Sequence, residues 1–241
     1  MSAENSVPAI SRRAALLGTA AVIAARGAAA QSDSRSTPEE RSRFPRASAA
    51  AGRGLDVERF VDDCRRAHET ADAQAAVREV LARAIADPGA VLRGVGEPEK
   101  GGIETLHRSA SLTVLNIVWA PLMQLMPHEH DMWSVIGIYT GREDNIFWQR
   151  ASGTIEAVGA EAISPGRAVP LARDVIHSVA NPIGKLTGAI HIYGGDFFAV
   201  PRSEWDPETL RERDWDIERA VEIFEQSNER FFSWNPGREC A

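Results

Sequence analysis

Apolar residues recur at helical spacing in two segments that follow residue 54. The first segment contains Val57, Phe60, Val61, Cys64 and Ala67. The second contains Val77, Val80, Leu81, Ala84 and Ile85, and it is followed by Asp87, Pro88 and Gly89. Repeats of three and four residues place these side chains on one face of a helix. We therefore predict that folded structure begins near Leu55 with two short amphipathic helices that pack against the outside of a β domain.

Between about Ile103 and Phe198 the pattern changes to short runs of β-branched and aromatic residues, separated by glycine, proline and asparagine. Seven of these runs are predicted to be strands: Leu112–Trp119, Ser134–Tyr139, Asn145–Gln149, Thr154–Val158, Ala168–Leu171, Val175–Val179 and Gly188–Tyr193. Many short strands with no helices between them are typical of a β-barrel or a β-sandwich. The pattern therefore predicts a mainly β fold class.

Helical signals return after Pro201. Asp206 precedes Pro207, which is a favourable pair for a helix start because aspartate caps the first turn and proline fits its first position. A second stretch opens at Asp216 and continues through Ile217, Ala220, Val221 and Phe224. Short C-terminal helices are therefore expected after the strands.

The stretch Pro127–Gly141, PHEHDMWSVIGIYTG, contains two histidines separated by one residue. Successive side chains of a strand point to opposite faces, so His128 and His130 share a face while Glu129 points away. Two imidazoles on one face can offer two nitrogen ligands to a single metal ion. Histidines at this spacing are also compatible with a simple hydrogen-bonding role, and the pair alone leaves both interpretations open.

Length and charge limit the classes of function. The chain has 241 residues, 44% of them hydrophobic, which is enough for one domain of moderate size. Its net charge is −7, and residues 1–53 carry eight arginines against four acids, so the remainder is strongly acidic. This balance argues against nucleic acid as a partner. No apolar run is long enough to span a bilayer, so no stable membrane association is expected. The oligomeric state is left open.

Residues 1–53 are interpreted as a leader and a linker that precede a single domain over residues 54–241. Ser11, Arg12 and Arg13 come before the apolar stretch Ala14–Ala25, which resembles a twin-arginine export signal. Export would place the protein in the periplasm. The alternative is an extension without signal function, in which case the protein would be cytoplasmic.

The two cysteines, Cys64 and Cys240, are too few for a disulfide framework. Cys64 falls on the apolar face of the first predicted helix, and we interpret it as a small core residue.

Two segments of the chain together resemble the paired motifs of the cupin family, G(x)5HxH(x)3,4E(x)6G and G(x)5PxGxxHxxxN. The first motif is matched by His128, His130 and Gly141, and the second by Gly166, His177 and Asn181. The resemblance implies a cupin double-stranded β-helix, also called a jelly-roll barrel, with short flanking helices. It also implies metal ligands at His128, His130 and His177. The glutamate of the first motif is replaced by Ser134 or Val135, so the site would hold three neutral histidines and no carboxylate.

PHEHDMW, DVIHSVAN and AIHIYGGD resemble more narrowly the thiol dioxygenases, which include cysteine dioxygenase and 3-mercaptopropionate dioxygenase. The resemblance covers about residues 55–200. It implies an Fe(II) enzyme whose partners are O2 and a small thiol, cysteine-like or 3-mercaptopropionate-like, and whose product is a sulfinate. Val135 stands where mammalian members carry a cross-linking cysteine, so the chain is similar to the bacterial kind.

Ala189, His191 and Tyr193 lie two residues apart and therefore share one face of a strand. Cysteine dioxygenases carry a Ser-His-Tyr relay at the corresponding positions. The resemblance thus implies catalytic roles for Tyr193 and His191, with Ala189 in place of the serine. A buried tyrosine beside a core histidine is the alternative.

Arg108 precedes the first long strand, where thiol dioxygenases place an arginine that holds the substrate carboxylate, so the resemblance implies substrate binding by Arg108. A guanidinium can donate two parallel hydrogen bonds to a carboxylate. A surface arginine is the alternative. Arg150 and Arg173 are weaker alternatives. Trp133 is predicted to wall the pocket, and Trp148 is a second aromatic candidate.

Two rival functions remain compatible with the sequence. Three histidines and a water are also a catalytic zinc arrangement, suited to a hydrolase or lyase. The other rival is a non-catalytic cupin in which the metal holds a ligand without turnover.

Overall fold

A computed structural model of the protein describes residues 52–234. The leader predicted for residues 1–53 lies almost wholly outside this range, and so does Cys240. None of the helices between residues 52 and 234 combines the length and the apolar character needed to cross a membrane.

Three helices precede the strands: α1 (Val57–His68), α2 (Ala73–Ile85) and α3 (Pro88–Val95). Each follows an aspartate whose carboxylate accepts a hydrogen bond from a backbone N–H of the first turn, namely Asp56, Asp72 and Asp87. The two predicted helices are confirmed. The third was not predicted, because Asp87 and Pro88 were interpreted as the end of α2. They also begin α3, since Asp87 caps it and Pro88 occupies its first turn.

Eleven strands are described between residues 52 and 234: β1 (Gly102–Arg108), β2 (Thr113–Trp119), β3 (Gln124–Glu129), β4 (Ser134–Thr140), β5 (Glu143–Ala151), β6 (Thr154–Ile163), β7 (Ala168–Leu171), β8 (Ile176–Ala180), β9 (Thr187–Tyr193), β10 (Ser203–Trp205) and β11 (Glu212–Asp214). All seven predicted strands are confirmed with small shifts of their ends. β5 and β6 are longer than predicted, while β1, β3, β10 and β11 were not among the predicted strands.

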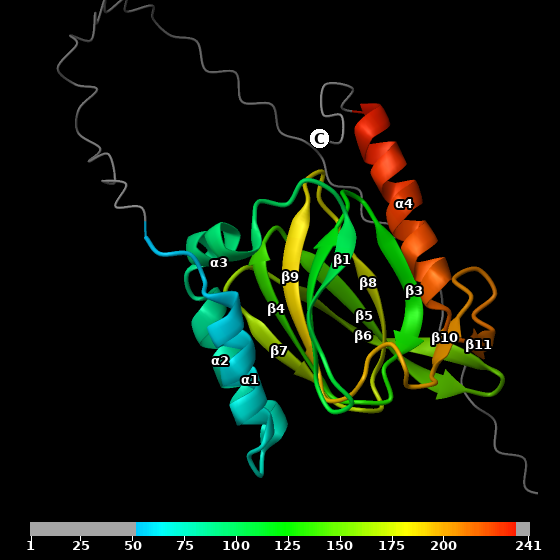
Figure 1. Cartoon of the computed structure of the whole chain (residues 1–241). Helices are drawn as coiled ribbons and strands as arrows, with labels where there is room; N and C mark the ends of the chain where they lie inside the picture. The colour runs from blue at the N-terminus through cyan, green and yellow to red at the C-terminus, as the bar shows by residue number, and fades with distance from the viewer. Residues whose placement is uncertain (1–51, 235–241) are drawn as a thin grey trace, which may run out of the picture. The chain divides into compact units, whose positions relative to one another are not determined.

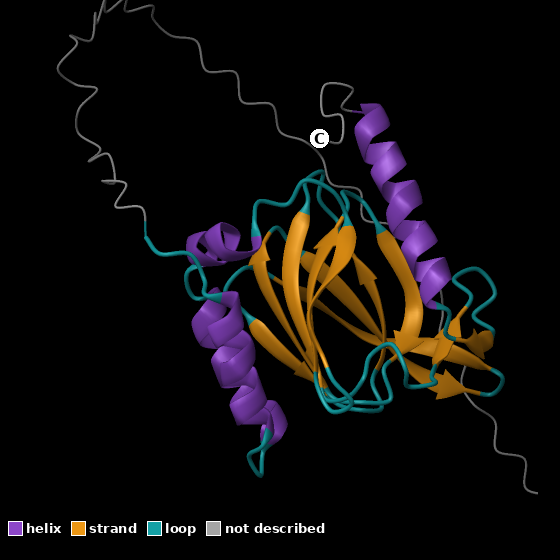
Figure 2. Cartoon of the chain, in the orientation of Figure 1, coloured by secondary structure: helices purple, strands orange, loops and turns teal. Residues whose placement is uncertain are grey.

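The strands form two antiparallel sheets, with the orders β1-β2-β9-β4-β7 and β11-β10-β3-β8-β5-β6. Within the run from β2 to β9, the orders 2-9-4-7 and 3-8-5-6 are those of an eight-stranded jelly roll. The predicted double-stranded β-helix is therefore confirmed by the strand order of the chain itself. Figure 2 shows the strands enclosing the interior and the helices lying outside them.

The outer face of the first sheet is covered by α1, α2 and α3 (Figure 1). On β9 the side chains alternate, so that Ile190 and Ile192 pack under these helices while Ala189 and Tyr193 join the clusters inside the barrel. Cys64 is fully buried in the same outer cluster, where burial raises the pKa of its thiol to about 12. Its interpretation as a core residue is confirmed.

The C-terminal part differs from expectation at one point. The helix predicted to start at Asp206 is wrong, because Asp206 lies in the turn between β10 and β11, where its carboxylate accepts the backbone N–H groups of Glu208 and Thr209. The chemistry that caps a helix closes a turn equally well. The stretch opened by Asp216 is helical as predicted, and forms α4 (Ile217–Trp234). α4 runs along the side of the barrel opposite α1 and α2, next to β1 and β3 (Figure 1).

Candidate metal centre

The three predicted ligands come from two neighbouring strands. His128 lies in β3 and His177 in β8, and the two are paired directly across the antiparallel register. His130 lies one residue beyond the end of β3. His128 was expected to lie on a strand, and it does, whereas His130 lies in the connection between two strands. β3 ends at Glu129, Asp131 turns the chain with a φ of 52°, and β4 begins at Ser134.

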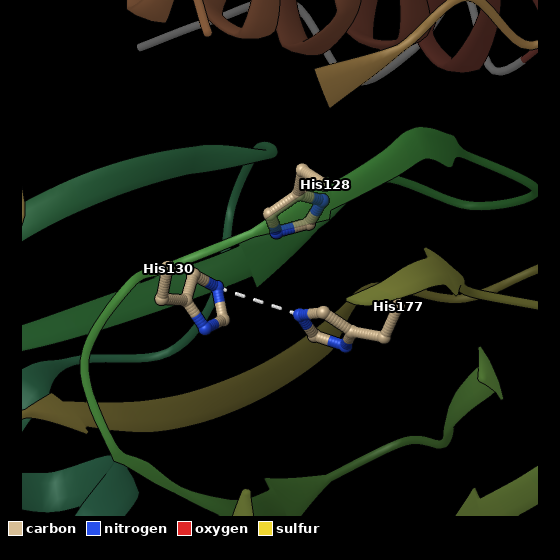
Figure 3. A group of neighbouring side chains, drawn as sticks. All are labelled: His128, His130 and His177. Atoms are coloured by element: carbon tan, nitrogen blue, oxygen red, sulfur yellow. Dashed lines mark hydrogen bonds between the residues drawn. The ribbon is translucent and has the colours of Figure 1, made fainter. Parts of the chain in front are cut away.

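The imidazoles of His128, His130 and His177 nevertheless converge on one point, as Figure 3 shows. One ring nitrogen from each lies within 4.8 Å of the others, and the Nε2 atoms of His130 and His177 are 3.4 Å apart. Two nitrogens bound to one ion at about 2.1 Å are separated by roughly 3.0–3.4 Å at ordinary coordination angles. The arrangement thus fits a shared metal ion with little movement.

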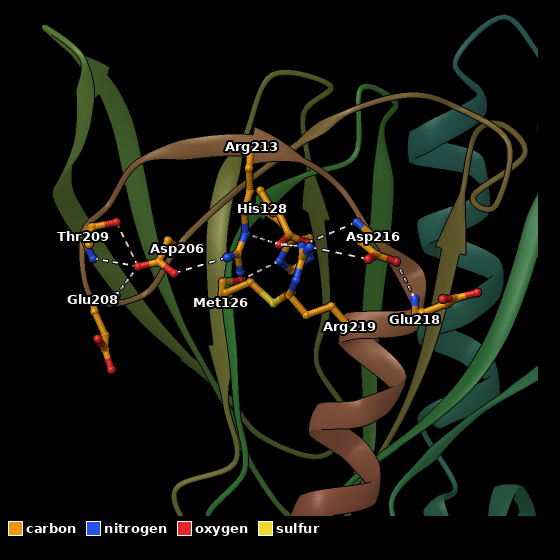
Figure 4. Close-up of polar contacts among 10 residues, drawn as sticks. Met126, His128, Asp206, Glu208, Thr209, Arg213, Asp216, Glu218 and Arg219 are labelled. Atoms are coloured by element: carbon orange, nitrogen blue, oxygen red, sulfur yellow. Dashed lines mark hydrogen bonds and ion pairs between the residues drawn. The ribbon is translucent and has the colours of Figure 1, made fainter.

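The other ring nitrogens hold the imidazoles in orientation. His128 donates its Nδ1–H to the carbonyl oxygen of Met126 at 2.9 Å, a pair seen in Figure 4. His177 donates its Nδ1–H to Oδ1 of Asn145 at 2.6 Å. Such bonds fix the tautomer and leave Nε2 of each ring free to bind a metal.

Burial keeps these histidines neutral. It lowers the pKa of His128 to about 4 and lowers the pKa of His130 and of His177 well below the usual value. The neighbouring histidines lower the pKa of His130 and His177 further. Neutral imidazole is the form that coordinates metals, so the site can accept an ion without first losing protons.

A buried carboxylate lies behind the ligands and was missed by the sequence reasoning. Glu143 is fully buried; it accepts the Nδ2–H of Asn145 at 3.0 Å and the indole N–H of Trp119 at 2.7 Å. Its Oε2 is also 3.3 Å from Nε2 of His191. The available signal was the same alternation that marks the two histidines, because Glu143 and Asn145 lie two residues apart at the start of β5. The polar sequence after Gly141 instead suggested a turn.

The predicted pair of His191 and Tyr193 lies at the same cavity. Nδ1 of His191 is 3.1 Å from the Tyr193 hydroxyl, and the Tyr193 ring is 4.9 Å from the ring of His130 between centroids. Burial raises the pKa of Tyr193, which keeps the phenol protonated. Their catalytic role stays a prediction.

The cavity beside the histidines is small. Its volume is about 20 Å3, room for roughly one water molecule. Besides the histidines, its walls include aromatic side chains from several elements: Trp119, Tyr193, Phe197, Trp215 and Phe224. Phe224 of α4 stacks on Trp119 with 5.4 Å between ring centroids, so the C-terminal helix forms part of the roof. A wider groove of about 690 Å3 lies over the outer face of β3, β8 and β5, and the three histidines do not line it.

The residues predicted to bind substrate lie away from this cavity. Arg108 is 49% exposed and donates two hydrogen bonds to Asp196, at 2.9 and 3.0 Å. Trp133 packs beside His68, with 5.8 Å between ring centroids. Neither Arg108 nor Trp133 lines the cavity. Their predicted roles stay predictions that the geometry does not favour.

The weaker candidates, Arg150, Arg173 and Trp148, do not line the cavity either. Arg150 pairs with Glu129 and Glu212, and Arg173 with Asp131. Trp148 lies at the outer groove, where its indole N–H donates to Ser178.

A different arginine, Arg202, does not line the cavity itself but stacks on two of the rings that do. Arg202 is only 8% exposed and stacks on Phe197 and Trp215, with its guanidinium carbon 4.4 and 4.5 Å from the two ring centroids. Its Nη1 donates to the carbonyl oxygens of Phe197 and Val200, whereas Nε and Nη2 are buried without a hydrogen-bond partner in the described part of the chain. Burial lowers its pKa to about 10, and its charge contributes to lowering the pKa of His128. Nothing in its sequence context distinguished it from other arginines.

Ion pairs hold the C-terminal segment against the barrel. Glu204 of β10 is fully buried opposite His128, and it accepts hydrogen bonds from Arg213 Nε at 2.7 Å and from Arg219 Nη1. The backbone N–H of Asp216 also points to Glu204, at 3.3 Å. Figure 4 shows these two arginines and Asp216 gathered beside His128. The start of α4 is thereby fixed next to the candidate metal centre.

No protein-family model matches the chain. Among solved structures, it is similar to an RmlC-like cupin family protein with a double-stranded β-helix fold from Methanocaldococcus jannaschii, with 13% identity over 42% of this chain and 86% of that one, at a TM-score of 0.36. An uncharacterised conserved protein with a double-stranded β-helix domain from Klebsiella pneumoniae shows 8% identity over 42% and 76% of the two chains, at 0.34. A cupin domain from Bordetella pertussis shows 17% identity over 40% and 95%, at 0.32.

Similarity at this level is too low to indicate the chemistry of the site, so only the side chains of this protein can indicate it. The order of strands in this chain gives the double-stranded β-helix, and His128, His130 and His177 inside it form a candidate metal centre.

Proposed function

We propose that this protein is an iron(II)-dependent dioxygenase that oxidises a small thiol to a sulfinate. The observation that carries the proposal is the ligand set: three neutral, buried histidines whose ligand nitrogens lie within 4.8 Å of one another, with no carboxylate in the group among residues 52–234, beside a Tyr193–His191 pair. The resemblance to thiol dioxygenases supports the same choice. When bound there, iron(II) supplies the redox chemistry by which both atoms of O2 join one sulfur, R–SH + O2 giving R–SO2H.

The residues of the chain have separate roles in this proposal. His128, His130 and His177 hold the ion and, being neutral, leave its full positive charge to favour the thiolate form of the substrate. Tyr193 offers its hydroxyl beside His130, and His191 orients that hydroxyl. The aromatic walls exclude bulk water from the reacting atoms.

We propose further that Arg202, and not Arg108, binds the carboxylate of the substrate. Nε and Nη2 of Arg202 are buried without hydrogen-bond partners among residues 52–234, whereas Nε and Nη2 of Arg108 both donate to Asp196. A buried donor without a partner is costly, so a ligand that satisfies it gains affinity. The cavity must widen to admit such a substrate, because about 20 Å3 cannot hold a thiol.

The test of the reaction is oxygen uptake by purified protein reconstituted with iron(II). Cysteine, 3-mercaptopropionate and cysteamine are supplied in turn, and the mass of the product is measured by mass spectrometry. We expect uptake in proportion to thiol and a product heavier by two oxygen atoms. Metal analysis of protein from its native host, showing zinc in place of iron, together with no uptake, would favour the hydrolase or lyase alternative.

The test of Arg202 uses a matched pair, Arg202→Met and Arg108→Met. For a thiol with a carboxylate, Arg202→Met is expected to raise KM by about 10–100-fold, since a charge-assisted bidentate contact contributes about 1.5–3 kcal/mol. Cysteamine, which has no carboxylate, should be affected little. The assignment to Arg202 is wrong if Arg108→Met gives the selective loss instead.

A further inference from the structure

One chain of polar contacts runs from a buried carboxylate to a candidate metal ligand. Glu143 and Asn145 lie two residues apart on β5, so both side chains point into the barrel, where both are buried. Oε1 of Glu143 lies 3.0 Å from Nδ2 of Asn145. Oδ1 of Asn145 lies 2.6 Å from Nδ1 of His177. The carboxylate therefore reaches the ligand through a single amide.

A second series of polar contacts starts from the other oxygen of the Glu143 carboxylate. Oε2 of Glu143 accepts the indole N–H of Trp119 at 2.7 Å and lies 3.3 Å from Nε2 of His191. Nδ1 of His191 in turn lies 3.1 Å from the hydroxyl of Tyr193. The two series of contacts end at two residues that line the cavity, the candidate metal ligand His177 and Tyr193.

The direction of the first chain follows from what each group can donate. The Trp119 indole only donates, so the group at position 143 must accept there, and a carboxylate accepts on both oxygens. Asn145 then turns its NH2 to Glu143 and its carbonyl oxygen to His177. Facing an acceptor, His177 carries its proton on Nδ1, which leaves the lone pair of Nε2 directed at His130 and the metal position.

The same reasoning applies to the second chain. A bare Nε2 lone pair 3.3 Å from a carboxylate oxygen would be repelled, so His191 carries its proton on Nε2. That N–H is not well aligned with the oxygen, and Nε2 has no hydrogen-bond partner within residues 52–234. Nδ1 then accepts the O–H of Tyr193. Ala189, which is fully buried on the same strand, has no hydroxyl that could hydrogen-bond to His191.

We propose that Glu143 is a positioning residue that sets the tautomers of His177 and His191, the first through the hydrogen bonds of Asn145 and the second through the carboxylate oxygen 3.3 Å from Nε2. It keeps the metal-facing nitrogen of His177 free of a proton, and it leaves Nδ1 of His191 free to accept from Tyr193. The inference rests on the proposed metal centre, and not on which thiol is oxidised.

The experiment exchanges acid and amide between the two positions. In Glu143→Gln the amide accepts from Trp119 with its oxygen and turns its NH2 toward Asn145. Asn145 must then present its oxygen to position 143 and its NH2 to His177, which moves the His177 proton to Nε2. In the double variant Glu143→Gln, Asn145→Asp, the new carboxylate again accepts from Nδ1 of His177. All side chains keep their size, so packing alone predicts no difference.

Two measurements follow the change. Nitrogen-15 NMR of the metal-free protein at neutral pH reports which nitrogen of each histidine bears the proton. Titration calorimetry with zinc as a redox-stable probe, and with iron(II) without oxygen, reports metal affinity. We expect the wild type to show Nδ1–H at His177 and Nε2–H at His191. Glu143→Gln should reverse His177 and weaken metal binding by about 10–100-fold. The double variant should restore the His177 tautomer and most of the affinity.

The control is Glu104→Gln, which removes an acid that also accepts from an asparagine, Asn116, but lies on β1 away from the histidines. It should leave metal affinity and both tautomers unchanged. The proposal is overturned if wild-type His177 bears its proton on Nε2, if Glu143→Gln binds metal like the wild type, or if the double variant binds no better than the single one. If the wild-type protein binds no metal, the proposed function is wrong. The histidine tautomers measured by NMR would still test the role of Glu143 in that case.

Discussion

At the scale of the residue, the site is defined by burial of groups that usually face water. His128 shows the consequence most directly, because burial lowers its pKa to about 4 and Nδ1 is already committed to the carbonyl of Met126. The ring is held neutral, and its free nitrogen can bind a metal. The same burial makes the metal-free protein sensitive to acid.

We therefore predict that the metal-free protein loses stability as the pH falls from 6.5 to 4. Between these values an unfolded histidine binds a proton and folded His128 does not, so the unfolded state binds more protons and the free energy of unfolding decreases. The loss from His128 alone is on the order of 3 kcal/mol by pH 4. Urea titrations across this range, compared with His128→Asn, measure it. Equal slopes for the two proteins would show that His128 has no such role.

Single residues were predicted unevenly from the sequence. The candidate ligands His128, His130 and His177 could be found because their positions resemble the paired cupin motifs, and the structure brings them together. Arg202 could not be found, because its importance comes from burial between two rings contributed by other segments. A guanidinium at the surface and one in the interior look alike in a sequence.

At the scale of the element, alternation and capping explain most of the secondary structure. β9 buries both faces, one under the helices and one toward the cavity, and its every second residue was assigned to the correct side. The capping pattern gave a wrong prediction of a helix at Asp206, since an aspartate followed by proline can begin a turn as well as a helix. The hairpin of β10 and β11 is only three residues per strand, too short for a pattern to emerge.

The contact between α2 and β4 gives a prediction at this scale. A methyl group at Gly137 would lie 2.8 Å from Cγ of Leu81, which is fully buried, so Gly137→Ala should destabilise the fold by about 1–3 kcal/mol. Gly159→Ala is the control, because the nearest atom to its new methyl group is 4.0 Å away on Phe147. Thermal unfolding of both variants separates the two cases. A stable Gly137→Ala protein would mean that α2 can move away from the sheet.

At the scale of the whole molecule, the candidate metal centre brings together parts of the chain that are far apart in sequence. The three histidines come from β3, the turn that follows it, and β8, and Glu204 fixes the C-terminal segment beside them. The sequence predicted the barrel as a class. It could not predict that α4 lines the cavity, because Trp119 and the Phe224 ring that stacks on it are far apart in the sequence.

Metal should therefore stabilise the entire fold. At a free metal concentration 100 times Kd, binding adds about 2.7 kcal/mol, which for a domain of this size raises Tm by roughly 5–10 °C. Differential scanning calorimetry with and without zinc or iron(II) measures the shift. His177→Ala should abolish the shift, whereas Arg108→Met should retain it. An equal loss in both variants would contradict the assigned roles.

Phe224 of α4, stacked on Trp119, also has a consequence for the rate of the proposed reaction. A cavity with room for about one water cannot hold a waiting reactant. Because Glu204 fixes the start of α4, we expect the Phe224 ring, and not the whole helix, to move each time a reactant enters or a product leaves. If the proposed function is right, entry and not the chemistry at the ion limits the rate, and turnover slows in viscous solvent even when the reactant is abundant.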